Sequence, residues 1–196
     1  IKISSFSLKT GARFNDKLNG TFSINYVNET VDNRARLSDS PGNTNYTVFS
    51  LPASINVENL EGSTDKKGAD EDGNELKFND NDFVTNPYWS TYQFKNKSVK
   101  NRMIGNIQLR YQIYDGFYAR GRISLDRYDR RRTNLEPYGT AFKALGSIDE
   151  ESNFFQEINS EIILGYDKDL TDAIGLNIFA GANKMDNKYE TLINSG

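Results

Sequence analysis

The feature of this sequence that most restricts its fold is a period-two alternation of apolar and polar residues over long stretches. Between residues 4 and 14, one set of alternate positions is mostly apolar, namely Phe6, Leu8, Thr10, Ala12 and Phe14. Such alternation indicates a β-strand with one apolar face. The pattern recurs in three pairs of stretches, at 4–14 and 20–28, 102–113 and 117–126, and 154–166 and 174–181. Each pair, joined by a short link, predicts a β-hairpin.

The lengths of these strands and of their connections predict a membrane barrel. A transmembrane β-strand needs about 9–11 residues, whereas strands in globular proteins run nearer 5–6. The connections alternate between tight links at 15–18, 114–116 and 167–172 and long ones at 30–100 and 128–153. Outer-membrane barrels alternate short periplasmic turns with long extracellular loops in this way. We therefore expect an all-β chain that forms about six long strands of a large antiparallel transmembrane β-barrel, with extracellular loops at 30–100 and 128–153.

Six strands are too few to close such a barrel. Single-chain outer-membrane barrels have eight strands or more, and an open sheet edge in hydrocarbon leaves backbone groups without hydrogen-bond partners. We expect residues 1–196 to be an internal section of the barrel domain, after a plug domain that the chain lacks and before the final strands.

The composition excludes several kinds of site. His and Cys are absent, so the chain has no imidazole base, no thiolate nucleophile and no nitrogen or sulfur ligand for zinc. Asp149, Glu150 and Glu151 form an acidic run without the context of a catalytic pair. No catalytic residue, metal ligand or cofactor is predicted. A net charge of −3 gives no basic footprint, so nucleic acid is not an expected partner.

The first long loop and the strand after it carry an ordered set of motifs. A segment containing Leu-Pro at 45–62 precedes an acidic, Gly-rich stretch at 65–82, then NPYW at 86–89 and the strand NRMIGNIQLRYQI at 101–113. With the hairpin that follows, the chain from residue 6 to about residue 129 resembles the SusC/RagA-like TonB-dependent outer-membrane transporters. The NPYW motif is the most specific element of the resemblance.

The resemblance implies a function that composition and periodicity do not. Such transporters import glycans, glycan fragments or oligopeptides, powered through TonB, with a SusD-like surface lipoprotein over the extracellular mouth. For this chain it implies a section of the pore wall and two extracellular loops, embedded in outer-membrane lipid. Contact with the TonB complex would belong to an N-terminal region outside this sequence.

Three aromatic residues of the first loop, Tyr88, Trp89 and Tyr92, are candidates for ligand contact. Flat apolar ring faces with polar rims suit a sugar ring, and Trp89 is the single Trp of the chain. The alternative interpretation is that these rings pack the loop or lie in the interfacial aromatic girdle.

Charged residues on the polar faces of the strands are candidates for the lumen wall. They are Arg102, Arg110, Arg120, Arg122, Asp126 and Glu161. An Arg on the lipid face at the bilayer midplane costs about 2–4 kcal/mol, so these side chains are expected to face a hydrated lumen or the plug.

Two further charged clusters have simpler interpretations beside the functional ones. Arg127 and the run at 130–132 lie at the outer end of a strand, where they would either bind lipopolysaccharide phosphates or form a solvated loop. Asp70, Asp72 and Asn74 have the spacing of a calcium loop. A residue other than Gly follows Asn74 where such a loop needs its turn glycine, so calcium is not predicted.

Two other classes of protein remain open from sequence alone. A soluble β-sandwich that binds carbohydrate also has strands with one apolar face. It would pack against each other the faces led by Phe6, Phe22, Ile107, Ile123 and Ile162. A barrel that does not use TonB, such as a porin or a secretion component, would have similar strands and no plug.

Overall fold

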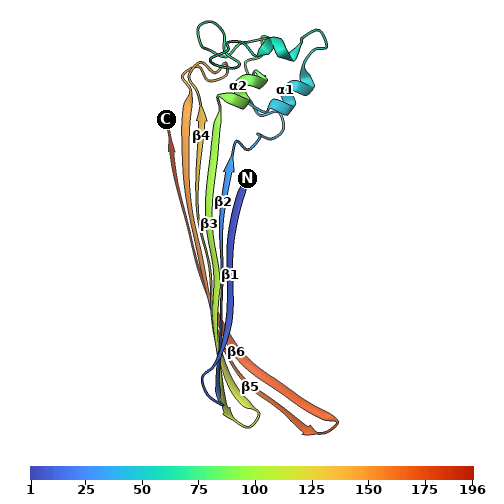
Figure 1. The fold of residues 1–196 in the computed structure, drawn as a ribbon. Coiled ribbons are helices and arrows are strands. Elements are labelled where there is room, and N and C mark those ends of the chain that lie inside the picture. The colour runs from blue at the N-terminus through green and yellow to red at the C-terminus, as the bar shows by residue number, and fades with distance from the viewer.

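The computed structural model describes residues 1–196 and contains one six-stranded antiparallel sheet (Figure 1). Each strand pairs with its neighbours in the sequence, in the order β1 to β6. The strands are β1 (Lys2–Arg13), β2 (Leu18–Asp32), β3 (Lys95–Tyr114), β4 (Phe117–Glu136), β5 (Ser147–Thr171) and β6 (Ile174–Ser195). The three predicted hairpins and the all-β fold class are confirmed.

The connections differ sharply between the two ends of the sheet. One end has short turns at 14–17, 115–116 and 172–173, while the other has a long loop at 33–94 and a shorter one at 137–146. The structure corrects the expected loop at 128–153, because β4 and β5 remain paired until Glu136 lies opposite Ser147. Beyond residue 126 both faces of β4 carry charged residues, so the alternation ends although the hydrogen-bonded pairing continues.

The pairing register places the apolar residues on one face of the sheet. Phe22, Ile107 and Ile123 are direct cross-strand partners, and they continue the row that begins on β1. Ile107 is 53% exposed and Ile123 58%, so nothing within the chain covers this face. Residues of a soluble sandwich would instead face a second sheet. The sandwich alternative is therefore wrong for this chain, since its proposed apolar faces all belong to the same side of one sheet.

The apolar band is staggered from strand to strand. It covers 6–14 on β1 and 174–182 on β6, with centres at Thr10 and Ile178. Following the direct partners from strand to strand, Thr10 on β1 is level with Lys184 on β6. The centre of the band on β6 is Ile178, which lies six residues closer to the turns than Lys184. The band therefore shifts by six residues across five pairs of neighbouring strands. With a rise of about 3.3 Å per residue and a strand spacing of about 4.8 Å, this corresponds to a strand tilt of about 40°. Barrel strands in membranes have a similar tilt.

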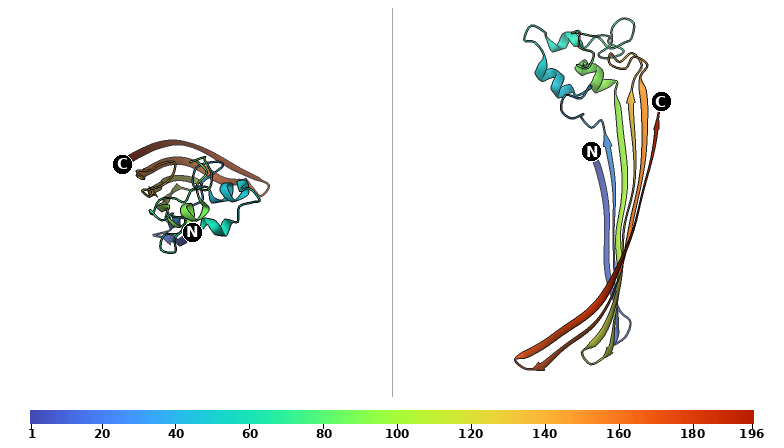
Figure 2. Two further views of the ribbon diagram at one scale, coloured as in Figure 1. Left: turned by 90° about the horizontal axis from the view of Figure 1, so that it is seen from above. Right: turned by 180° about the vertical axis from the view of Figure 1, so that it is seen from behind.

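The loops form a layer at one end of the sheet (Figure 2). They contain the helix α1 (Thr44–Ser50), the 3-10 turn η1 (Val57–Leu60) and the helix α2 (Pro87–Tyr92). None of these helices is long and apolar enough to cross a bilayer. The buried hydrophobic residues are few and most lie in this layer, as Leu60, Ala69, Trp89 and Phe94 do. The sheet itself has no apolar core and depends on its hydrogen-bonded register.

A charge on the apolar face tests whether that face contacts lipid. We expect Ile123→Arg, in the middle of the band, to cost about 2–4 kcal/mol and to lower the amount of folded protein in the outer membrane. Ser124→Arg is the matched control, because it adds the same side chain to the next residue on the opposite face. Heat-modifiable migration of the intact protein would measure the folded fraction. Equal loss in both variants would contradict a lipid-facing band.

Candidate functional site

The NPYW motif organises the long loop through its first residue. Asn86 caps α2, since its side-chain oxygen accepts from the backbone N–H of Tyr88 at 2.9 Å and of Trp89 at 3.2 Å. Its amide nitrogen donates to the carbonyls of Leu60 at 2.9 Å and Leu76 at 3.0 Å. Asn86 is 1% exposed, and its bonds to Leu60 and Trp89 are fully buried. One amide thereby fixes α2 to two distant parts of the loop.

Trp89 joins the two loops. Its ring is 0% exposed, and its indole N–H donates to the Thr140 hydroxyl at 3.0 Å. Ala69 and Phe94 complete the buried cluster, and the Lys66 ammonium lies 4.4 Å from the ring centroid. A ligand cannot reach this ring in the structure. The burial of Trp89 agrees with the packing interpretation, and its ligand contact stays a prediction.

Tyr88 and Tyr92 remain accessible beside this anchor. Their rings stack with centroids 6.3 Å apart, and Tyr92 is 55% exposed. The Lys67 ammonium lies 5.2 Å from the Tyr92 centroid. Ligand contact by these two tyrosines stays a prediction.

Glu75 is a second link between the loops. Its two carboxylate oxygens accept from the backbone N–H of Asn86 at 2.6 Å and of Ala141 at 2.8 Å. Burial raises the pKa of Glu75 above its ordinary value, although the two backbone donors oppose the shift. The residue that interrupts the calcium-like spacing in the sequence is thus a structural carboxylate.

In the acidic loop before Glu75, the Asp70 carboxylate binds backbone groups of the same loop. Asp70 accepts from the backbone N–H of Asp72 at 3.0 Å and of Asn74 at 2.9 Å, which closes a tight turn. No group of three or more acidic side chains in the chain is arranged to hold a metal ion.

Arg36 attaches the loop to the end of β4. Its guanidinium pairs with Glu136 at 2.5 Å, donates to the carbonyl of Pro41 at 2.9 Å and lies 4.9 Å from the centroid of Phe94. Burial alone would raise the pKa of Glu136, but hydrogen bonds from Arg36 and Ser147 outweigh it and the pKa is lowered. The loop layer is therefore attached to the polar side of the sheet.

All six charged residues predicted for the lumen wall lie on the polar face of the sheet. Arg102 and Asp126 form a two-bond pair at 2.9 and 2.6 Å. Glu161 accepts from Arg120 at 3.3 Å and Arg122 at 3.1 Å. Their shared face agrees with the predicted pattern, while the lumen-lining role itself stays a prediction.

The last member of this set, Arg110, is paired differently. Its guanidinium lies 3.8 Å from the centroid of Tyr118, which is 8% exposed. A cation stacked on an aromatic ring is stabilised without a carboxylate partner.

The arginine cluster beyond residue 126 does not form one patch. Arg130 and Arg132 pair with Glu151 at 3.0 and 2.8 Å on the polar face. Arg127 and Arg131 lie at alternate positions of the same strand and therefore project from the opposite face. The acidic run is divided in the same way. Glu151 lies on the polar face with Arg130 and Arg132, and its neighbour Glu150 lies on the opposite face.

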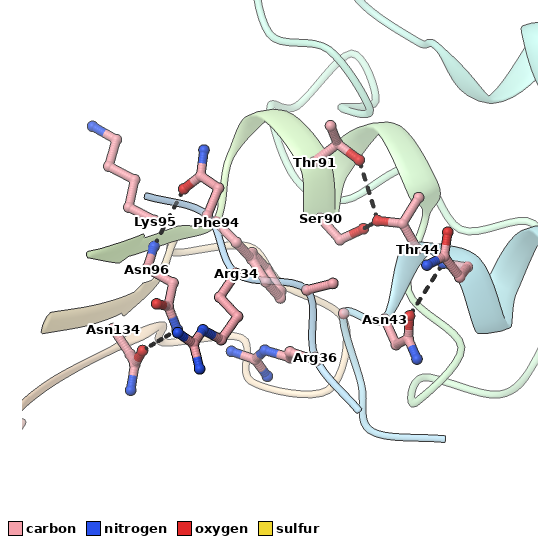
Figure 3. Close-up of a pocket in the computed structure, with 14 residues that line it drawn as sticks. Arg34, Arg36, Asn43, Thr44, Ser90, Thr91, Phe94, Lys95, Asn96 and Asn134 are labelled. Atoms are coloured by element: carbon pink, nitrogen blue, oxygen red, sulfur yellow. Dashed lines mark hydrogen bonds between the residues drawn. The ribbon is translucent and has the colours of Figure 1, made fainter. Parts of the chain in front are cut away.

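A polar cavity of about 220 Å³ lies where the loop leaves β2 and enters β3 (Figure 3). Five amides line it, namely Asn33, Asn43, Asn45, Asn96 and Asn134. Three hydroxyls join α1 to α2 at its wall, with Thr44 2.9 Å from Ser90 and 3.2 Å from Thr91. Sequence reasoning missed this cavity, because its residues come from four separate segments without a shared motif.

Comparison with known proteins identifies the fold. No protein-family model matches the sequence, and no curated protein shows significant sequence similarity. Among solved structures, the RagAB peptide transporter superposes with a TM-score of 0.72 at 13% identity. The RagAB peptide importer matches in its open-open state with a TM-score of 0.70 at 13% identity and in its closed-closed state with 0.68 at 11%.

The chain has the fold of a section of these RagAB structures. Each match covers 98% of this chain and 21% of the other, so the sheet and the loop layer are both included. The chain thus spans about a fifth of the length of the structures that it matches. The resemblance inferred from the NPYW motif and the long strands is confirmed at the level of fold.

Two glycines test the packing of the loop around Trp89. Gly68 and Gly73 both have φ +79°, but a Cβ on Gly68 would lie 2.2 Å from the Trp89 backbone nitrogen, whereas one on Gly73 would meet nothing within 4 Å. Alanine at either position carries a backbone strain of about 1–2 kcal/mol. We expect Gly68→Ala to add a steric overlap and to raise the rate of tryptic cleavage of the loop at least about tenfold over Gly73→Ala. Similar rates would show that this contact does not hold the loop.

The raised pKa of Glu75 predicts a pH-dependent loop. The folded loop holds the Glu75 proton more tightly than the open loop, so this contribution to stability is full below the ordinary pKa and is lost as pH rises through the raised pKa. We expect the ratio of cleavage rates, Glu75→Gln over wild type, to fall between pH 4.5 and pH 8. Taking the ratio at each pH cancels the pH dependence of the protease. A constant ratio would mean that Glu75 titrates normally.

Proposed function

We propose that this chain forms part of the pore wall and two extracellular loops of a TonB-dependent outer-membrane importer. The observation that supports this most directly is the fold match to the RagAB structures, which includes both the long strands and the loop layer. The apolar outer face and the paired charges on the opposite face suit a wall between lipid and water.

The cargo that we propose is an oligopeptide or a glycan. The matched structures are described as a peptide importer, and the accessible Tyr88 and Tyr92 offer ring faces near the mouth. We propose further that a SusD-like lipoprotein covers the loop layer and that the TonB complex acts through a part of the protein outside these residues. The location would be the outer membrane, with residues 33–94 and 137–146 on the extracellular side.

The mechanism in this proposal is gated passage without bond cleavage. The ion pairs of Arg102 with Asp126 and of Arg120 and Arg122 with Glu161 would give the lumen a hydrated, charge-balanced wall. A polar solute meets no apolar barrier along such a wall. The buried anchors at Trp89 and Glu75 would keep the loops in place above the pore while the cargo enters.

Uptake measurements on cells that carry the intact protein test this proposal. We expect deletion of its gene to abolish TonB-dependent uptake of a labelled oligopeptide or oligosaccharide mixture, and a lipoprotein to co-purify with the detergent-extracted protein. The solutes that accumulate in wild-type cells identify the cargo class. Diffusive uptake that is independent of TonB would favour a porin instead.

A further inference from the structure

The polar cavity between β2, β3, α1 and α2 lies at the base of the loop layer. Its lining contains only two hydrophobic residues and no carboxylate. Its amides and hydroxyls present both donors and acceptors to the interior (Figure 3). A surface of this kind suits a polar solute that forms many hydrogen bonds.

The two arginines of the cavity differ in their partners. Arg36 forms an ion pair with Glu136 and packs against Phe94, so its charge is already balanced. Arg34 forms no ion pair, and its guanidinium lies beside Asn96 and Asn134 (Figure 3). Arg34 is therefore the cation of this cavity that lacks a counter-charge.

The segment that carries Arg34 is fixed on both sides. Asn33, with φ 50°, turns the chain out of β2, and its backbone N–H donates to the carbonyl of Asn96 at 2.6 Å. Arg36, two residues after Arg34, donates to the carbonyl of Pro41 at 2.9 Å. Arg34 is thus presented from a short, anchored segment, which lowers the entropy cost of binding.

Lys95 is not a second cation for the cavity. Its backbone is part of the lining, but its ammonium points away from Arg34 and the amides (Figure 3). Asn96 and Asn134 are joined to each other, with the Asn96 amide donating at 2.6 Å, which leaves the Asn134 amide N–H free to bind an acceptor.

We propose that this cavity binds the carboxylate of a short polar oligomer, with Arg34 as its counter-ion and the neighbouring amides as further donors. This deepens the proposed import function and rests on it. Guanidinium pairs with a carboxylate through two parallel hydrogen bonds, which is the strongest recognition that this lining offers. The carboxylate would be the C-terminus of a peptide or the acid group of a uronic-acid sugar.

Binding measurements on the intact, detergent-purified protein with any co-purifying lipoprotein test the proposal. The probes are N-acetylated tetra-alanine, its C-terminal amide, a uronate-containing disaccharide and the corresponding neutral disaccharide. We expect wild type to bind at least one acid more tightly than its neutral partner, and the acid that binds identifies the source of the carboxylate. Arg34→Gln should weaken that binding roughly tenfold to a hundredfold and leave the neutral probe unaffected.

Two further variants control this experiment. Lys97→Gln also removes one positive charge. Lys97 lies at the end of β3 that borders the cavity but is not part of its lining, so this variant should leave affinity for the acid unchanged. Arg34→Lys keeps the charge without the planar fork and should bind with intermediate affinity. All variants are compared at equal amounts of folded protein in the membrane.

The outcomes separate this inference from the function on which it rests. Equal affinity for the acid and neutral probes, or no effect of Arg34→Gln, would overturn the carboxylate site while leaving the importer intact. Failure to bind any probe, together with absence of TonB-dependent uptake, would overturn both.

Discussion

The continuous antiparallel pairing from β1 to β6 is the constraint on which the rest of this structure depends. The apolar face of this sheet has no second layer of the chain packed against it, so the backbone bonds and the register define the sheet. A slip of one residue would move the apolar side chains to the polar face and the paired arginines Arg102, Arg120 and Arg122 to the apolar face. The ion pairs of Glu161 with Arg120 and Arg122 penalise such a slip, because each joins side chains that meet only in the observed register.

The loop layer is organised by a different principle. It has a small buried core, and its polar groups are satisfied one by one. Asn86 uses both ends of its amide, Glu75 uses both carboxylate oxygens, and Trp89 uses its single donor. Buried polar groups of this kind are costly when left unpaired, which makes the arrangement specific. The cavity beside Arg34 differs, because its amides keep donors that nothing in the chain occupies.

The sequence predicted the sheet well, because period-two alternation acts over single strands and requires no knowledge of distant contacts. It located the three hairpins and the common face of Arg102, Arg120 and Glu161. The sequence did not predict the outer end of β4 beyond Arg127, where charged residues occupy both faces. Alternation of apolar and polar residues reports which face is apolar, and the hydrogen-bonded pairing of strands continues where that alternation stops. The sequence also signalled the NPYW motif but not its use. The burial of Trp89 depends on Thr140, which lies 51 residues away in the other loop.

The links across the loop layer have a mechanical consequence. Residues 33–94 connect β2 to β3, residues 137–146 connect β4 to β5, and Glu75 and Trp89 bind one loop to the other. Two buried side chains thereby link four strand ends through the loop layer. A force applied to either loop is therefore shared by all three hairpins. A protein docked on the loop layer would therefore respond to movement of the sheet below it without contacting any strand.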